Sequence, residues 1–179
     1  MTIEKLVQSY HVLIDEFLLL HQEALVAMNF ELAFDIWCLF SDLLQSHIEV
    51  ENQYLMGVFS RFCGDVRWPM SLYLHEHHKI IRLQSEVTTR LNDLQATPTR
   101  RGVVMLLDYQ RSFKNVIEHH EEREEIALLK ELQAQVPADV LAELMRELEA
   151  AWPSIDSLLE QKTLFEQRLA SLDIYKLRL

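Results

Sequence analysis

Six residues of this chain are of metal-binding types and share the helical phase of the apolar positions around them: His21, His47, Glu51, His77, His120 and Glu124. Two pairs have the spacing HxxxE, namely His47 with Glu51 and His120 with Glu124. Because an α-helix turns once in about 3.6 residues, positions i and i+4 lie one above the other on one face. Each pair therefore directs an imidazole and a carboxylate into the same volume, and the other two histidines add imidazoles from two further helices. Four histidines and two glutamates converging in a bundle of four helices form a ligand set for two metal ions.

The choice among the eight histidines depends on their neighbours at i±3 and i±4. His77 and His120 have mainly apolar neighbours at these positions, whereas the histidines beside them have a larger share of polar or charged neighbours. His11 lies on a mixed face between Gln8 and Ile14, and we leave it out of the predicted site. The predicted site therefore omits four of the eight histidines, His11, His75, His78 and His119.

A single histidine on an apolar stripe is usually a hydrogen-bonded core residue, and a single HxxxE on a Glu-rich helix is usually a solvated face. Six such residues in phase with four successive helices favour a metal site, since burying them without partners costs several kcal/mol each. Imidazole and carboxylate together suit iron, manganese or zinc, and no thiolate is placed to help. A structural zinc site closes with four ligands. Six candidates indicate two ions bridged by Glu51 and Glu124.

The elements that position these residues are helices. The chain of 179 residues is 49% hydrophobic and has only three Gly and four Pro, which leaves little turn material for a sheet protein. Apolar periodicity predicts long helices over residues 2–28, 31–62, 68–95 and 98–135, followed by two amphipathic segments, 138–151 and one that starts at Pro153. We expect an all-α fold, an up-down-up-down four-helix bundle with two extra C-terminal helices. Residues 1–135 would form the bundle with the metal site, and residues 136–179 a helical hairpin packed on the bundle or on a partner.

Charge and cysteine content exclude several classes of protein. The formal net charge is −11, which disfavours binding to nucleic acid or to an anionic membrane. Cys38 and Cys63 form no CxxC motif and no disulfide framework. The N-terminal segment lacks a basic region followed by an apolar core, and no apolar run approaches about 18 residues. We expect a soluble cytoplasmic protein.

The chain resembles the hemerythrin-like (HHE cation-binding) family. The shared pattern is H…HxxxE…H…HxxxE, here His21, then HIEVE at 47–51, LHEHHKI around His77, and HEERE at 120–124. The resemblance covers about residues 1–132. The complete pattern is specific to the family, whereas each of its parts alone is a weak signal. It implies a non-haem centre of two iron ions with an oxo or hydroxo bridge. Glu51 and Glu124 would bridge the ions, and His21, His47, His77 and His120 would be terminal ligands.

The chain departs from the oxygen-carrying hemerythrins in two ways. Those proteins have a second histidine one turn before the single ligand of the third helix, where this chain has Tyr73. Their last carboxylate follows its histidine by five residues, and here the spacing is four. One iron would therefore lack an imidazole. A phenolate from Tyr73 or Tyr54 would fill that position, or the position would be open to water and small ligands, or both tyrosines would be ordinary core residues.

The expected function is binding of, or reaction with, O2, peroxide or nitric oxide, in sensing, storage or stress response. A reversible O2 carrier is disfavoured by the missing imidazole and the added helices. One alternative is iron donation in the repair of iron–sulfur clusters, although such proteins usually carry a cysteine-bearing N-terminal domain. Another is a metal-dependent signalling module in which residues 138–179 contact a second copy of the chain or another protein. The residue pattern alone does not distinguish an enzyme from a binding protein.

Overall fold

The structure is a computed structural model that describes residues 2–172, and every regular element in that range is helical. The prediction of an all-α protein is confirmed. Residues 173–179, the end of the predicted C-terminal part, lie outside the described residues. In chain order the elements are α1 (Ile3–Val26), α2 (Phe30–Val50), η1 (Glu51–Leu55), α3 (Met56–Phe62), α4 (Met70–Ala96), α5 (Arg100–Arg123), η2 (Glu124–Leu128), α6 (Leu129–Gln135), α7 (Ala138–Ala151) and α8 (Ile155–Ala170).

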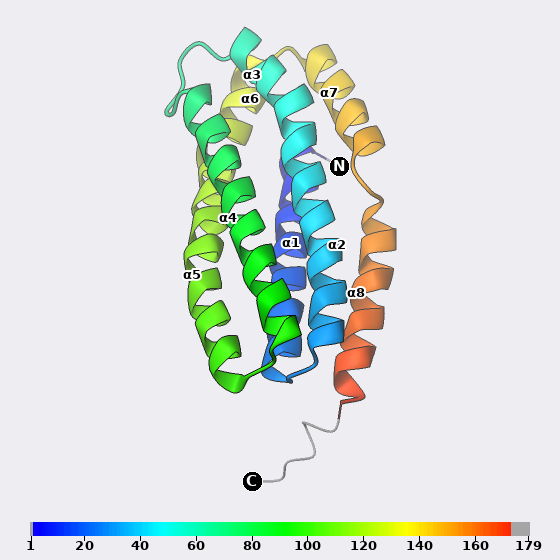
Figure 1. Cartoon of the computed structure of the whole chain (residues 1–179). Coiled ribbons are helices and arrows are strands. Elements are labelled where there is room, and N and C mark those ends of the chain that lie inside the picture. Colours follow the sequence, from blue (N-terminus) through cyan, green and yellow to red (C-terminus); the bar gives the residue numbers. More distant parts are fainter. Residues whose placement is uncertain (1, 173–179) are drawn as a thin grey trace.

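Short turns join α1 to α2 and α4 to α5, so each of these pairs runs antiparallel (Figure 1). The turn after α1 has Met28 in the left-handed region, with φ 57°. Asn29 then caps α2, because its side chain accepts a hydrogen bond from the N–H of Leu32. Thr99 caps α5 in the same way. These signals explain why the helices begin and end close to the residues expected from the sequence.

The segments predicted as single helices over 31–62 and 98–135 are continuous but not uniform. Each contains one π-helical stretch, η1 and η2 respectively. In η1 the carbonyl of Glu51 accepts from the N–H of Met56, and in η2 that of Glu124 accepts from Leu129. Both stretches therefore begin at the glutamate of an HxxxE pair. Helical widening of this kind occurs frequently at functional sites.

The α4–α5 pair packs closely at its turn. A Cβ added to Gly102 would lie 2.6 Å from the Leu94 side chain, so glycine lets α5 approach α4 there. The apolar faces of α1, α2, α4 and α5 form one continuous buried core, with Phe17, Trp37 and Phe40 among its largest members. The candidate site lies within this core.

The last two helices, expected as a hairpin, do not fold back on each other (Figure 1). α7 and α8 follow one another along the same side of the molecule, where α7 contacts η1 and α8 contacts α1 and α2 (Figure 1). Extended backbone at Trp152, followed by Pro153, separates the two helices. α8 is held by apolar packing, for example Phe165 edge-on to Phe17 with ring centroids 6.4 Å apart. We refer to α7 and α8 together as the C-terminal helices.

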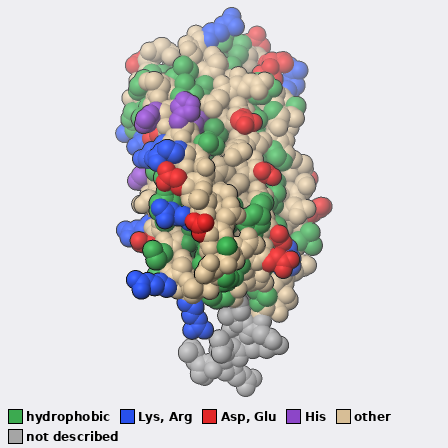
Figure 2. Space-filling view, viewed as in Figure 1, with side chains coloured by type: hydrophobic (Ala, Val, Ile, Leu, Met, Phe, Trp, Pro, Cys, Tyr) green, Lys and Arg blue, Asp and Glu red, His purple; other side chains and the backbone are tan. Residues whose placement is uncertain are grey.

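None of the helices within residues 2–172 combines the length and apolar character that crossing a lipid bilayer requires. Figure 2 shows acidic side chains spread over the face in view, and basic side chains gathered mainly along its α4–α5 edge.

Candidate metal centre

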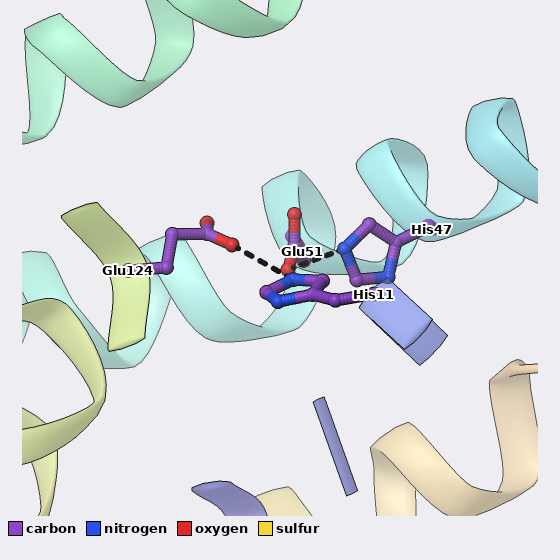
Figure 3. A group of neighbouring side chains, drawn as sticks. All are labelled: His11, His47, Glu51 and Glu124. Atoms are coloured by element: carbon purple, nitrogen blue, oxygen red, sulfur yellow. Dashed lines mark ion pairs between the residues drawn. The ribbon is translucent and has the colours of Figure 1, made fainter. Parts of the chain in front are cut away.

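Five of the six predicted ligands meet in the interior, and the sixth member of the cluster is His11. The side chains form two groups that share both glutamates: His11, His47, Glu51 and Glu124, and Glu51, His77, His120 and Glu124. Within each group, one donor atom of every residue lies within 4.8 Å of the donor atoms of the others. All six residues are at most 3% exposed. Either group can therefore hold a metal ion, and Figure 3 shows the first of them.

Each glutamate reaches imidazoles from both groups. The two carboxylate oxygens of Glu51 lie 3.1 Å from Nε2 of His47 and 3.4 Å from Nε2 of His77. Glu124 repeats this arrangement, at 3.3 Å from Nε2 of His11 and 3.4 Å from Nε2 of His120. The ligand set is thus symmetric, with two imidazoles at each end and two carboxylates between them.

Nε2 of His77 and Nε2 of His120 lie 3.0 Å apart, within hydrogen-bond distance, but the other donor atoms of the cluster have no such partner among the described residues. Both oxygens of Glu51 and of Glu124, and Nε2 of His11 and of His47, are buried and form no hydrogen bond with any residue of 2–172. The distances are short, but the angles do not suit hydrogen bonds. Buried carboxylates without donors destabilise a fold by several kcal/mol, whereas cations satisfy carboxylate and imidazole lone pairs together. The residues present therefore fit a pair of metal ions.

Contacts on the outer nitrogens fix three of the four imidazoles. Nδ1 of His77 lies 2.8 Å from Oδ1 of Asn52, and Nδ1 of His11 lies 3.0 Å from a carboxylate oxygen of Glu125. Nδ1 of His120 lies 3.3 Å from an oxygen of Glu76, which is in turn paired with Arg123. An Nδ1–H that donates to such an acceptor leaves Nε2 free to bind a metal, as is usual for metal-bound histidines. Sequence reasoning did not identify these supporting residues.

The pKa shifts of Glu51 and His11 also indicate that the cluster favours positive charge. Burial alone raises the pKa of Glu51, but the neighbouring imidazoles of His47 and His77 outweigh it and hold that pKa well below its ordinary value. Burial alone lowers the pKa of His11, but its contacts with Glu124 and Glu125 bring that pKa well above its ordinary value. The raised pKa of His11 favours a proton there, and a bound cation would take over the role of that proton.

The structure places His21, expected as a ligand, outside both candidate groups. His21 is buried in another layer of the core, where its Nδ1 lies 2.8 Å from the carbonyl oxygen of Ala33 and its Nε2 lies 2.8 Å from Nε2 of Gln110. Gln22 donates to the oxygen of Gln110, which leaves the Gln110 amide to donate to His21. Both ring nitrogens of His21 are therefore engaged in hydrogen bonds. Burial lowers the pKa of His21 to about 4.

His21 lies outside the cluster because of its position along the axis of α1. His11 and His21 are both buried on α1, but at 1.5 Å per residue they lie about 15 Å apart along its axis. In an antiparallel pair, residues equally far from the turn lie level with each other. His47 lies about 18 residues after the α1–α2 turn and His11 about 16 before it, whereas His21 is only about 6 before it. The ring centroids of His11 and His47 are 5.1 Å apart. Counting from the turn would have identified His11.

The two tyrosines considered from the sequence differ in environment. Tyr73 is fully buried beside the second group, its ring edge-on to that of His120 at 6.4 Å, and its hydroxyl has no hydrogen-bond partner within residues 2–172. Burial raises the pKa of the Tyr73 hydroxyl above its ordinary range. Tyr54 is half-buried and packs against the edge of the core. Of the two, Tyr73 has the environment of a residue near the site.

Comparison with protein-family models, with curated proteins and with solved structures finds no match for this chain.

Proposed function

We propose that this protein is a hemerythrin-like, non-haem di-iron protein that binds or reacts with O2, peroxide or nitric oxide. In this proposal α1, α2, α4 and α5, with their π-helical and terminal extensions, form the four-helix bundle, and the C-terminal helices are added to it. The observation that carries the proposal is the sharing of Glu51 and Glu124 by two histidine pairs. A structural site for one ion needs only one of the two histidine pairs.

The donor set is compatible with iron. Each group offers two imidazole nitrogens and two carboxylates, a combination of nitrogen and oxygen ligands that suits iron. Four protein residues leave positions free on an ion that takes six ligands. Bound iron would supply the redox change and the Lewis acidity that chemistry with O2, peroxide or nitric oxide requires.

The surrounding protein restricts what reaches the centre. All six side chains are almost completely buried, so large substrates have no direct contact with them. Small neutral or anionic ligands match this enclosure. The role of the chain is to hold three of the four imidazoles by their outer nitrogens, to keep the carboxylates between the imidazoles, and to exclude bulk water.

The test is the metal content of protein produced in iron-replete cells, with optical spectra before and after addition of azide. About two irons per chain and a new charge-transfer band with azide are expected. The spectrum without azide also tests Tyr73, because a phenolate ligand adds a visible band that Tyr73→Phe removes. Protein without iron, or with one zinc and no azide band, would overturn the proposal and leave a helical interaction domain.

Matched variants make this test specific. Since both groups share both carboxylates, Glu51→Gln or Glu124→Gln should lower the affinity for both ions, whereas replacing one imidazole should weaken mainly one ion. His11→Asn and His21→Asn form a matched pair of buried histidines on α1. We expect His11→Asn to lose about one iron per chain and His21→Asn to keep both. Equal loss in the two variants, with both folded by circular dichroism, would contradict the assignment of His11.

A further inference from the structure

Trp152 brings the C-terminal helices into contact with the candidate centre. It lies at the joint between α7 and α8 and is only 4% exposed. Its indole stacks on the imidazole of His47, with centroids 5.3 Å apart and ring planes 18° apart. Tyr10 completes the aromatic group, 4.5 Å from the indole and 6.3 Å from the imidazole. No other residue of the C-terminal helices stacks on a candidate ligand among the residues that the structure describes.

Among the four imidazoles, that of His47 is the one whose orientation is not fixed by a hydrogen bond within residues 2–172. The rings of His11, His77 and His120 are each fixed by an acceptor at Nδ1. Nδ1 of His47 is buried and has no hydrogen-bond partner anywhere in residues 2–172. Its ring orientation therefore depends on packing, and a nearly parallel indole restricts rotation of the ring about its bond to Cβ.

The indole is itself held in place from α1. The hydroxyl of Tyr10 donates to the carbonyl oxygen of Pro153, at 2.5 Å, and so ties the joint to the helix that carries His11. Leu144 and Leu148 bury the inner face of α7, and Phe165 anchors α8. The Tyr10 hydrogen bond and the packing of α7 place Trp152 against His47, whereas Phe165 packs on Phe17 further along α8.

We infer that Trp152 is a positioning residue of the metal centre: its indole holds the His47 imidazole in the binding orientation, so the C-terminal helices are part of the centre. This inference rests on the proposed function. It makes the two ends of the symmetric ligand set unequal. The ion held by His11 and His47 depends on Trp152, whereas the ion held by His77 and His120 depends on the contacts of their Nδ1 atoms with Asn52 and Glu76.

The experiment is a titration of the metal-free full-length chain with Co²⁺, followed by calorimetry and by the visible spectrum of the bound ion. We expect the wild type to bind two ions. Trp152→Ala should weaken one of them by about ten- to hundredfold, the usual effect of losing a residue that orients a ligand, and leave the other unchanged. Trp152→Phe should restore most of the affinity, because a ring still stacks on His47.

Phe165→Ala is the matched control. It removes a buried ring that holds the C-terminal helices but lies against Phe17 instead of against a candidate ligand. It should lower stability and leave both affinities unchanged. If Phe165→Ala and Trp152→Ala weaken the same ion equally, the contribution of Trp152 is general packing and the inference is overturned. Two unchanged affinities in Trp152→Ala would also overturn it, whereas a wild type that binds no ion would instead overturn the proposed function.

Tryptophan fluorescence provides a second readout that does not depend on the alanine variant folding. Co²⁺ at the His11 and His47 end should quench Trp152 strongly because the indole stacks on a ligand. Trp37 and Trp68 remain as internal references. We expect Trp152→Phe to lose most of the cobalt-dependent quenching seen in the wild type. Full quenching in Trp152→Phe would contradict the stacking on which the inference depends.

Discussion

His11 and His21 show how two buried histidines on one helix acquire different chemistry. His11 has carboxylates at both ring nitrogens, from Glu124 and Glu125. His21 has a carbonyl acceptor at Nδ1 and the amide donor of Gln110 at Nε2. An imidazole between two carboxylates favours a positive charge, whether a proton or a metal ion, whereas one that accepts a hydrogen bond at Nε2 must stay neutral. Residue type alone does not distinguish these environments.

Because His21 is neutral in the folded protein, we expect it to make the free energy of unfolding depend on pH under acidic conditions. Its pKa falls from an ordinary value of 6.5 to about 4 on folding, so between these pH values the unfolded chain binds a proton that the folded chain does not. The free energy of unfolding should therefore decrease as the pH falls from about 6.5 to about 4, with His21 accounting for about 3 kcal/mol. His21→Asn, which keeps a donor near Ala33, should reduce this slope whatever its stability at neutral pH.

Urea unfolding of both proteins at several pH values, with a chelator present, measures the two slopes. The other titrating groups are common to the wild type and the variant, so the difference between the curves reports on His21. Parallel curves between pH 4 and 6.5 would show that His21 is protonated in the folded state.

At the scale of elements, the positions of η1 and η2 connect local backbone geometry to the site. Both π-helical stretches begin at a shared glutamate, and η1 also contains Asn52, which contacts His77. A π-helical stretch changes the direction in which the following side chains point, compared with a regular α-helix. The HxxxE spacing itself stays in regular helix, so the sequence pattern predicted the pairs correctly but contained no sign of the widening after them.

The turn between α1 and α2 sets which residues of the two helices lie level, and it contains one strained residue. Met28 adopts φ 57°, a conformation that costs a non-glycine residue about 1–2 kcal/mol. Met28→Gly should relieve this strain and raise the free energy of unfolding by about 1 kcal/mol, after allowing for the greater flexibility of glycine in the unfolded chain. For a chain of this size the melting temperature should rise by about 2–4 °C.

Ala27→Gly is the control for that substitution. Ala27 has φ −68°, an ordinary helical conformation, so glycine there should lower stability. Thermal unfolding followed by circular dichroism compares the two variants. A loss of stability in Met28→Gly as large as that in Ala27→Gly would contradict the strain assigned to Met28.

At the scale of the whole molecule, a cluster of charged and polar groups lies within an apolar core closed by the C-terminal helices. The two carboxylates are fully buried and have no hydrogen-bond donors among the described residues. Such a core is destabilised while it lacks cations. The fold and the metal centre should therefore depend on each other thermodynamically.

This dependence predicts a large thermal shift. A ligand that binds only the folded state, at about a thousand times its Kd, adds about 4 kcal/mol for each site. At about 2–4 °C per kcal/mol, saturation of one site should raise the melting temperature by on the order of 10 °C, and a chelator should reverse the rise. The double variant Glu51→Gln with Glu124→Gln should melt at the same temperature with and without metal. An unchanged wild-type melting temperature on addition of iron or cobalt would count against the centre.

The sequence by itself determined the helices and most of the candidate ligands. Helical periodicity and capping residues are local signals, and they predicted the helical class, the helix ends and the pairs His47 with Glu51 and His120 with Glu124. The tertiary structure alone decided that His11, and not His21, lies level with those pairs, and that Trp152 stacks on His47 from more than 100 residues away in the chain. The physical reason is that periodicity fixes the direction in which a side chain points. Its height, and its neighbours on other helices, depend on turn geometry and on packing across the whole core.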